Sequence, residues 1–188
     1  YSCRTTNSYH RFYKYNNIIK DVEINRPNQV WAADITYIRT LKGFCYLALI
    51  TDMYSRKIVG YDLSDSLELK GCLRALNKAL YKTKNITGLI HHSDRGIQYA
   101  CEEFLDVLSK SKTIIRSMSR KGNCWDNAVM ESFFSRLKVE LIFAEKYQSI
   151  QQVKSSIFEY IEIFYNRVRQ HSTLGYLSPM QYERLNAY

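Results

Sequence analysis

The sequence predicts an α/β fold built on a mixed five-stranded sheet with helices on both faces. Three β-rich segments follow one another between residues 30 and 64, and their short connections favour antiparallel neighbours. Two more short apolar segments, 88–94 and 113–119, alternate with segments of helical periodicity. Strands that alternate with helices form parallel pairs in a sheet covered on both sides. We therefore expect three antiparallel strands followed by two parallel ones.

The first three segments each carry a strand signal. Residues 30–40 (VWAADITYIRT) are rich in β-branched and aromatic residues, and a turn at 41–43 follows them. Residues 44–54 are almost continuously apolar, which is typical of a central strand. After a second turn, residues 57–64 (KIVGYDLS) form the third strand.

Helices are predicted where apolar residues recur three and four positions apart. The expected helices are 67–82, 101–110, one that begins near 126, one at about 149–166, and a short one in the tail. Asp126 or Asn127 caps the third of these helices. On a helical projection, Glu131 and Lys138 fall on one flank of its apolar stripe, about two turns apart. The stripe consists of Met130, Phe133, Phe134, Leu137, Leu141 and Ala144.

Composition limits the class of protein. The chain has 188 residues, 46% of them hydrophobic, so one domain with a sizeable core can form. The net charge of +9 favours a polyanionic partner, usually nucleic acid, although a basic protein without one stays an alternative. The five cysteines are scattered, which argues against a zinc site or a disulfide framework and favours a reducing compartment. No apolar run approaches the ~18 residues of a membrane span, and no signal peptide opens the chain.

Three regions are expected along the chain. Residues 1–27 interleave basic and aromatic side chains, so they form an arm or linker that contacts DNA or packs on its own domain. Residues 28–145 form the main α/β domain, and residues 146–188 a helical extension packed on it. Because the chain opens on Tyr1 and not on methionine, we expect it to be part of a longer protein.

Three acidic residues are candidates for a functional site. Asp34 lies inside the first strand, on one side with Ala32 and Thr36, where an acid is costly unless it is paired or binds a metal. Asp94 ends the fourth strand, at the edge where open α/β sheets place their sites. Glu131 lies near the positive end of a helix dipole. If the first and fourth strands are neighbours and the helix packs across them, the three carboxylates converge.

Such a cluster would bind Mg²⁺ or Mn²⁺, because hard cations take oxygen ligands. Two such ions can clamp a phosphodiester and stabilise both the attacking and the leaving oxygen. Each acid also has a simpler explanation: Asp34 as a hydrogen-bond acceptor, Asp94 as a turn cap and Glu131 as the partner of a surface lysine. A basic protein that concentrates three acids favours the metal site.

Four blocks resemble the catalytic core of bacterial insertion-sequence transposases, in particular the family named after insertion sequence three, which is close kin of the retroviral integrases. They are WAADITYI (31–38), HSDRGIQY (92–99), SRKGNCWDNAVMESFFSRLKVE (119–140) and YNRVRQHSTLGYLSP (165–179). The resemblance implies a ribonuclease H-like fold with residues 28–145 as the catalytic core. It also implies a DDE triad at Asp34, Asp94 and Glu131. Thirty-six residues separate the last two, one more than is common in the family, and we expect a loop to absorb the insertion.

The resemblance implies a function as well. The core of a DDE transposase uses Mg²⁺ or Mn²⁺, expected here as two ions, to cut DNA at element ends and to join the freed strand to target DNA. We expect a homo-oligomer on DNA, in the bacterial cytoplasm with the nucleoid and not at a membrane. The resemblance places Lys138 near a DNA phosphate. The basic residues expected to contact DNA are Lys138, Lys121, Arg120, Arg136 and Arg95.

Other readings stay open. A nuclease with this fold would cut DNA but never join strands, and a DNA-binding remnant would do neither. A tyrosine recombinase is a third reading, because tyrosine is abundant and Arg167, Arg169 and His171 are basic. These three residues either face DNA or another subunit, or they tie the tail to the core.

Four further residues have structural interpretations. We expect Asp52 to serve a turn or a hydrogen bond, and Asp126 to cap a helix. For His91 and His92, which adjoin the second aspartate, we favour structural hydrogen bonding, with a role in the site as the alternative for His92.

Overall fold

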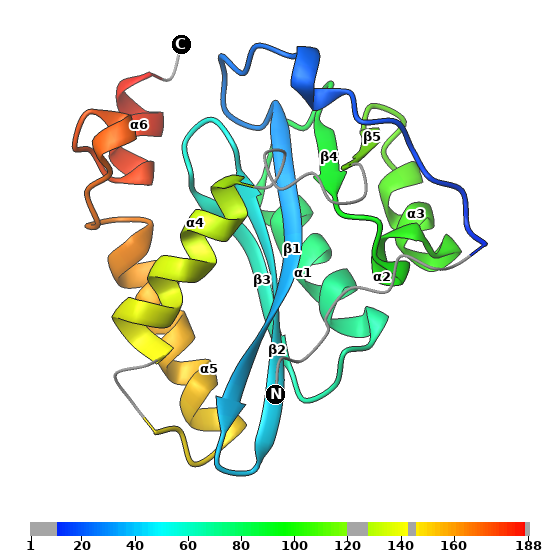
Figure 1. Cartoon of the computed structure of the whole chain (residues 1–188). Coiled ribbons are helices and arrows are strands. Elements are labelled where there is room, and N and C mark those ends of the chain that lie inside the picture. The colour runs from blue at the N-terminus through cyan, green and yellow to red at the C-terminus, as the bar shows by residue number, and fades with distance from the viewer. Residues whose placement is uncertain (1–10, 120–127, 143–145, 187–188) are drawn as a thin grey trace.

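A computed structural model describes residues 11–119, 128–142 and 146–186 of the chain. Five strands form one mixed sheet in the order β3-β2-β1-β4-β5 (Figure 1). Strands β1, β2 and β3 are antiparallel, whereas β4 is parallel to both β1 and β5. The bounds are β1 Val30–Thr40, β2 Gly43–Asp52, β3 Ile58–Ser64, β4 Ile90–Ser93 and β5 Ile115–Met118. The predicted fold class is confirmed, including the direct pairing of the first and fourth strands.

Helices cover both faces of the sheet. The α-helices are α1 Leu69–Lys82, α2 Ile97–Ala100, α3 Glu102–Ser109, α4 Ala128–Leu137, α5 Ile150–Phe158 and α6 Pro179–Leu185. Two π-helical segments, η3 Lys138–Ile142 and η4 Glu159–Tyr165, continue α4 and α5, and two 3₁₀ turns are η1 Ile19–Asp21 and η5 Ser172–Leu174. The helical periodicity therefore predicts the long helices, but not their change to the wider π form. The one-turn helix α2 was not predicted either. Among the described residues, no helix combines the length and the apolar character that crossing a membrane requires.

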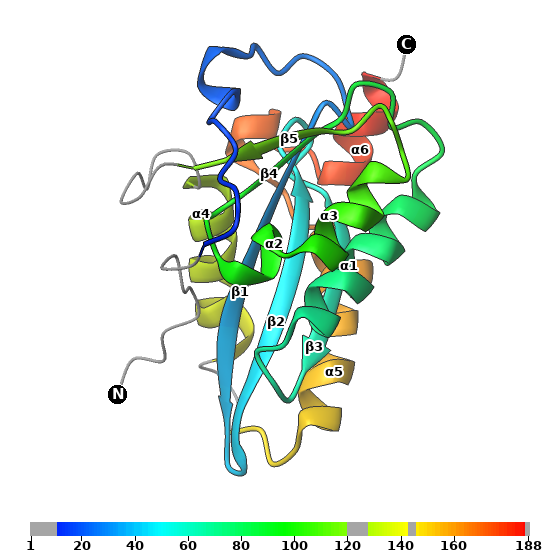
Figure 2. The same ribbon diagram turned by 90° about the vertical axis from the view of Figure 1, so that its right-hand side faces the viewer.

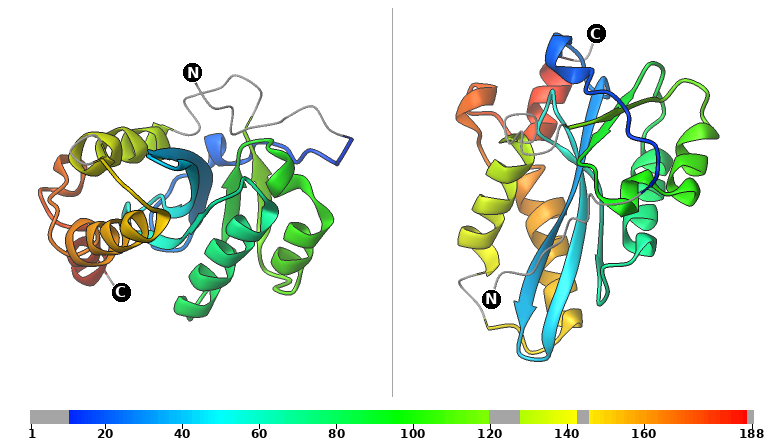
Figure 3. Two further views of the ribbon diagram at one scale, coloured as in Figure 1. Left: turned by 90° about the horizontal axis from the view of Figure 1, so that it is seen from below. Right: turned by 45° about the vertical axis from the view of Figure 1, so that its right-hand side comes forward.

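The alternation of side chains along β1 separates two cores. Trp31, Ala33 and Ile35 pack with α1 and α3 on one face. Ala32 and Ile38 pack with α4 and α5 on the other. Seen from below, α4 and α5 lie on one side of the sheet, and α1 and α3 lie on the opposite side (Figure 3, left). Strands β1 and β2 extend well beyond β4 and β5 as a long hairpin, as Figure 2 shows.

The apolar stripe of α4 attaches this helix to the sheet. Phe133, Phe134 and Leu137 are buried in the same core as Ala32 and Ile38 of β1. This part of the predicted stripe is confirmed, and Leu141 of η3 is partly buried against the same core. The side chain of Met130 and all of Ala144 lie outside the described residues.

The described part of the N-terminal arm packs on the domain. The guanidinium of Arg116 on β5 donates to the Tyr15 hydroxyl (2.6 Å), and its carbon atom lies 5.4 Å from the centroid of the Tyr15 ring. The backbone N–H of Met118 donates to the Asn16 carbonyl oxygen (3.4 Å). The arm thus covers the exposed edge of β5, which is where an uncovered strand invites unwanted pairing. Of the two readings of residues 1–27, packing on their own domain holds for this part.

The basic residues of the tail bond within the protein. Arg169 forms an ion pair with Glu140 of η3 (2.5 Å). Arg167 Nε donates to the carbonyl oxygen of Glu162 (2.9 Å). Of the two readings of these residues, Arg169 thus ties the tail to the core, and Arg167 bonds within η4 and its end.

Two further contacts attach the C-terminal region to β3 and the turn before it. The Asn166 side chain accepts the N–H of Ile58 (2.9 Å) and donates to the carbonyl oxygen of Ile58 (3.0 Å), as a neighbouring strand would. On α6, Glu183 forms an ion pair with Lys57 (2.6 Å), and its carboxylate accepts a hydrogen bond from the Ser55 hydroxyl (2.8 Å). Ser178 and Gln181 form a capping box that starts this helix.

Candidate active site

The two aspartates lie next to each other because β1 and β4 are paired in parallel. The register sets Ala33 opposite Ser93, so the following residues, Asp34 and Asp94, occupy neighbouring positions on adjacent strands. Such strands are about 4.8 Å apart. Asp34 Oδ1 accepts the N–H of Ile35 (2.7 Å). The sheet therefore sets the spacing of both carboxylates through backbone hydrogen bonds.

Tyr99 of α2 interacts electrostatically with both Asp34 and Asp94. Tyr99 of α2 is buried, and burial raises the pKa of its hydroxyl well above the usual value. The charges of Cys72, Asp34 and Asp94 raise this pKa further. Tyr99 is a neighbour of the site that the sequence analysis missed.

The turn after β4 holds Asp94 in place. Asp94 Oδ1 accepts the N–H of Gly96 (2.8 Å). A Cβ atom at position 96 would lie 2.9 Å from this oxygen, so only glycine allows the carboxylate to approach so closely. Arg95 Nε donates to the carbonyl oxygen of Ser119, at the end of β5 (2.9 Å). Arg95, predicted to contact DNA, thus also braces the edge of the sheet that carries Asp94, and its contact with DNA stays a prediction.

Glu131 is carried by the helix and not by the sheet. It lies in the first turn of α4 and is exposed. Among the residues that the structure describes, no three His, Cys, Asp or Glu side chains are close enough together to hold a metal ion. The oxygen donors of Asp34 and Asp94 match the ligands that Mg²⁺ and Mn²⁺ prefer. The convergence of all three acids stays a prediction.

Lys138 belongs to a basic and aromatic groove beside the turn that joins β1 to β2 at the tip of the long hairpin. Its ammonium nitrogen lies 5.1 Å from the centroid of the Tyr37 ring, within the range of a cation–π contact. The groove encloses about 460 Å³, and its lining includes Tyr37, Arg39, Thr40, Lys138, Lys146 and Tyr147. Its described lining contains three cations and no acid. Arg39 and Lys146 were missed in the sequence because 107 residues separate them and no local pattern joins them.

The remaining predicted DNA contacts have different positions. Arg136 is exposed on α4 and lines a second pocket. Arg120 and Lys121 lie outside the described residues, as does Asp126.

Asp52 is confirmed as a hydrogen-bonding turn residue. Its Oδ1 accepts the N–H groups of Tyr54 (2.9 Å) and Ser55 (2.8 Å), and Oδ2 accepts that of Asn28 (2.5 Å). Burial raises the pKa of this carboxyl, while these hydrogen bonds act in the opposite direction. Asp52 is fully buried and occupied by these donors, which fits a structural role.

The two histidines of β4 point to opposite faces of the sheet. His92 Nδ1 is hydrogen-bonded to the hydroxyl of Ser117 (2.8 Å), which confirms the structural expectation for this residue. His91 packs against the rings of Phe104 (5.4 Å) and Tyr99 (6.4 Å). Burial, followed by the charge of His92, lowers the pKa of His91 to about 3. Its Nε2 has no hydrogen-bond partner within the described part of the chain, so its main support is aromatic packing.

Comparison with known families agrees with this geometry. Two models of an integrase core domain match residues 24–124 and 131–186. This chain belongs to the integrase core domain family. The matched segments contain all three predicted acids, because Asp34 and Asp94 lie in the first and Glu131 opens the second.

The integrase core has relatives in bacterial insertion sequences. It is 44% identical over 176 residues to the "Insertion element IS600 uncharacterized 31 kDa protein" of Shigella sonnei, across 93% of this chain and 64% of the relative. It is 43% identical over 167 residues to "Transposase InsF for insertion sequence IS3A" of Escherichia coli strain K12, across 89% of this chain and 58% of that protein. The chain thus spans about three fifths of the length of these relatives.

Solved structures share the fold of this integrase core. The catalytic core domain of HTLV-2 integrase, solved in complex with magnesium, aligns with a TM-score of 0.64 and 14% identity, across 84% of this chain and 97% of that one. A chain of the simian T-cell lymphotropic virus intasome, solved in complex with PP2A regulatory subunit B56 gamma, aligns with a TM-score of 0.70 and 16% identity, across 96% of this chain and 62% of that one. The ribonuclease H-like fold is therefore confirmed.

Proposed function

We propose that this integrase core is the catalytic part of a transposase that cuts DNA at the ends of a mobile element and joins the freed strand to target DNA. One observation carries the proposal: the parallel pairing of Ala33 with Ser93, which sets Asp34 beside Asp94 in a chain of this family. The similarity to a bacterial transposase over 89% of the chain supports it.

Asp34, Asp94 and Glu131 are the proposed ligands of Mg²⁺ or Mn²⁺, with two ions at the site. When bound, such ions would supply Lewis-acid stabilisation of the attacked phosphodiester. Asp34 and Asp94 provide the part of the site that the sheet builds. Glu131 completes the set from α4. The similarity of fold to an integrase core solved with magnesium supports this assignment.

The reaction has two steps that share one site. Water attacks a phosphodiester at the element end, whose P–O3′ bond breaks and frees a 3′-hydroxyl. This hydroxyl then attacks a phosphodiester of the target, forms a new P–O bond and displaces a 3′-hydroxyl of the target strand. The protein must hold both DNA strands against their mutual repulsion. The groove around Lys138 suits this task, because its cations can contact phosphates while Tyr37 offers a face to a base or sugar. Arg136 and Arg95, and Arg120 and Lys121 before α4, are proposed as further contacts.

The proposal includes the organisation of the protein. Residues 28–145 form the catalytic core, residues 146–188 an extension that braces it, and residues 1–27 an arm that leads into it. The protein acts as a homo-oligomer that brings two DNA ends together, with the nucleoid in a bacterial cytoplasm. The bacterial sources of the relatives named above support this placement.

A strand-transfer assay tests the function. The purified protein is mixed with duplex DNA that carries labelled element ends and with unlabelled target DNA, in Mg²⁺, in Mn²⁺ or in EDTA. We expect cut and joined products with either metal and none in EDTA. Cutting without joining would favour a nuclease, and a covalent protein–DNA adduct in EDTA would favour a tyrosine recombinase. Failure of both steps, in a protein that binds DNA, would leave only a DNA-binding remnant.

A further inference from the structure

A second pocket lies beside the helix that carries Glu131. It encloses about 270 Å³ between α4, the turn from β2 to β3 and the segment after η4. The polar side chains on its wall include Arg56, Ser132, Arg136, His171, Ser172 and Thr173. These residues come from three parts of the sequence that only the fold brings together. Within the described lining there are two guanidinium groups and no carboxylate.

Arg56 occupies a backbone position that does not favour arginine. Its φ is +65°, in the left-handed region, where a Cβ atom is strained and glycine is preferred. The turn is held rigidly, because Asp52 accepts the N–H of Ser55 through its side chain and the N–H of Arg56 (2.9 Å) through its carbonyl oxygen. Glu183 holds the flanking side chain of Lys57. A strained backbone conformation that the surrounding structure maintains is common at functional sites, so the Arg56 side chain is a candidate for binding.

The positive charge in the pocket is not compensated by a contact. Neither Arg56 nor Arg136 forms an ion pair or a side-chain hydrogen bond with any residue that the structure describes. Burial lowers the pKa of Arg56, while the charges of Tyr165 and Asp52 raise it. Asp52 is not a ready partner, since three backbone N–H groups already occupy its carboxylate oxygens. A half-buried guanidinium that forms no ion pair with a described residue can bind an anion.

His171 shows how strongly positive this region is. Burial, and then the guanidinium groups of Arg169, Arg136 and Arg56, lower the pKa of its imidazole to about 4. Arg169 is already paired with Glu140, whereas Arg56 and Arg136 form no ion pair with a described residue. The imidazole is neutral near pH 7 and can donate one N–H without adding to the repulsion.

We propose that this pocket binds a backbone phosphate of the DNA substrate through the guanidinium groups of Arg56 and Arg136. The side chains of His171, Ser172 and Thr173 supply further donors. Guanidinium groups suit this task because their planar forks match the oxygens of a phosphate. Ser132 follows Glu131 on α4, so the pocket borders the helix that carries the third proposed ligand. The inference rests on the proposed function for the identity of the anion.

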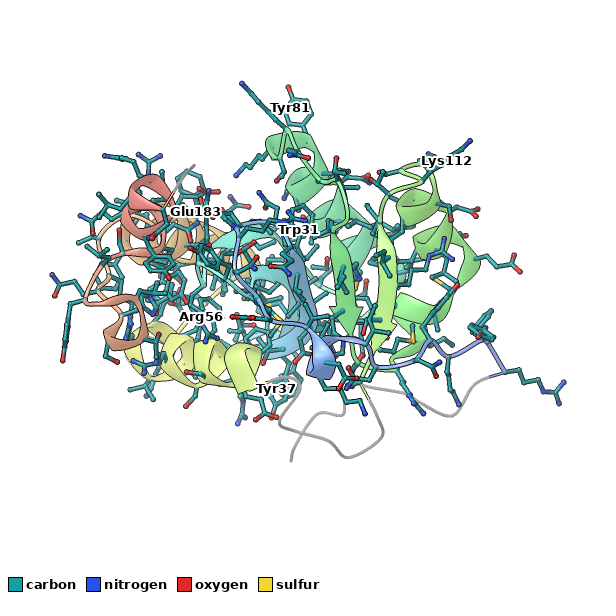
Figure 4. All side chains as sticks on the ribbon, turned by 90° about the horizontal axis from the view of Figure 1, so that it is seen from above. Trp31, Tyr37, Arg56, Tyr81, Lys112 and Glu183 are labelled. Carbon is teal, nitrogen blue, oxygen red and sulfur yellow. The ribbon has the colours of Figure 1, made fainter. Side chains whose placement is uncertain are left out.

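DNA binding in EDTA tests the inference without any chemistry. The affinity for a fluorescent duplex is measured by anisotropy at several salt concentrations, for Arg56→Gln and for Lys112→Gln. Lys112 is an exposed cation at the opposite end of the molecule, so it is a control for the loss of one charge (Figure 4). We expect Arg56→Gln to weaken binding about tenfold and to lower the slope of log K against log salt by about 0.9, the value for one phosphate contact. Lys112→Gln should leave the slope unchanged.

Arg56→Gly separates binding from structure. Glycine suits the left-handed turn, so this variant should melt at the same or a higher temperature than the parent and still lose affinity for DNA. Unchanged affinity and slope in both Arg56 variants would overturn the proposal. The same result, together with a shift of the His171 ring signals on adding inorganic phosphate, would assign the pocket to a free anion. If joining is absent from the parent protein but the slope still falls in Arg56→Gln, the proposed function fails and the phosphate site stands.

Discussion

The carboxylates of the proposed active site are positioned by two different kinds of force. Asp34 lies on a strand that is hydrogen-bonded on both sides, and Asp94 directly follows the neighbouring strand. Glu131 lies on α4, whose contact with β1 consists of buried side chains such as Phe133 and Leu137. A backbone ladder sets register to a single residue, whereas side-chain packing sets the place of a helix less tightly. The comparison shows that the sheet fixes the two aspartates, which form the fixed half of the site. The position of Glu131 depends on how α4 packs in the core that it shares with β1.

Removal of a carboxylate should have the largest effect. We expect Asp34→Asn, Asp94→Asn and Glu131→Gln each to reduce joining by more than about a hundredfold while the fold survives, because each would remove a metal ligand. Joining is measured with labelled ends, and folding by circular dichroism. A variant that joins DNA at the parent's rate would show that its residue is not a ligand.

The same three variants can separate the two halves of the site. A ligand that binds only the folded state raises its melting temperature. We expect Mn²⁺ to stabilise the parent protein, and this stabilisation to be lost in Asp34→Asn and Asp94→Asn. Glu131→Gln should keep part of it, because the aspartates alone form the part built by the sheet. Equal losses in all three variants would mean that the helix contributes as firmly as the strands.

A matched pair of core substitutions tests the role of packing. Leu137 of α4 and Leu76 of α1 are both 0% exposed, on opposite faces of the sheet. Each Leu→Ala change should lower the free energy of unfolding by about 2–5 kcal/mol, as urea titration would measure. Joining, measured where both variants are folded, should fall in Leu137→Ala and stay near normal in Leu76→Ala. If both variants join DNA equally well, the packing of α4 does not position Glu131.

Acid should lower the stability of the folded protein through His91, which lies on β4, the strand that Asp94 follows. Its pKa of about 3 in the folded protein lies below the value of about 6.5 expected in the unfolded chain. As the pH falls from 6.5 towards 3, the His91 imidazole is protonated in the unfolded chain but stays neutral in the folded protein. Stability present above pH 6.5 is therefore lost, at up to about 1.4 kcal/mol per pH unit.

His91→Phe should remove this contribution, because a phenyl ring can replace the imidazole against Phe104 and Tyr99. The loss of stability between pH 7 and pH 5, measured by urea titration, should be smaller in the variant by roughly 2 kcal/mol. Equal losses in the two proteins would assign the acid sensitivity to other groups.

The smallest expected effect concerns the caps of two C-terminal helices. Ser178→Ala removes half of the capping box of α6, and Ser149→Ala removes the cap of α5. Each change should lower the free energy of unfolding by about 1 kcal/mol. Only Ser178→Ala should also speed hydrogen exchange at the amides of the turn near Ser55, since α6 holds that turn through Glu183. Equal exchange in both variants would separate α6 from the rigidity of the turn.

The sequence by itself determined the order of the elements and the fold class. Apolar periods of two and of three to four residues are local signals, so the strand at 30–40 and the helix at 67–82 were predicted almost to the residue. The same local logic identified Asp52 as a turn residue. It also placed Asp34 on one face of the strand with Ala32, because side chains alternate along a strand, and the structure shows that α4 covers this face.

Only the tertiary structure decided which distant residues meet. The register of β1 on β4, the groove that unites Arg39 with Lys146 and the pocket that unites Arg56 with His171 depend on contacts between segments far apart in the chain. No local period encodes such pairs, because each depends on how whole layers pack together. The sequence could thus name the carboxylates and single cations such as Lys138, but the groove and the pocket that gather cations from distant segments appeared only once the chain was folded.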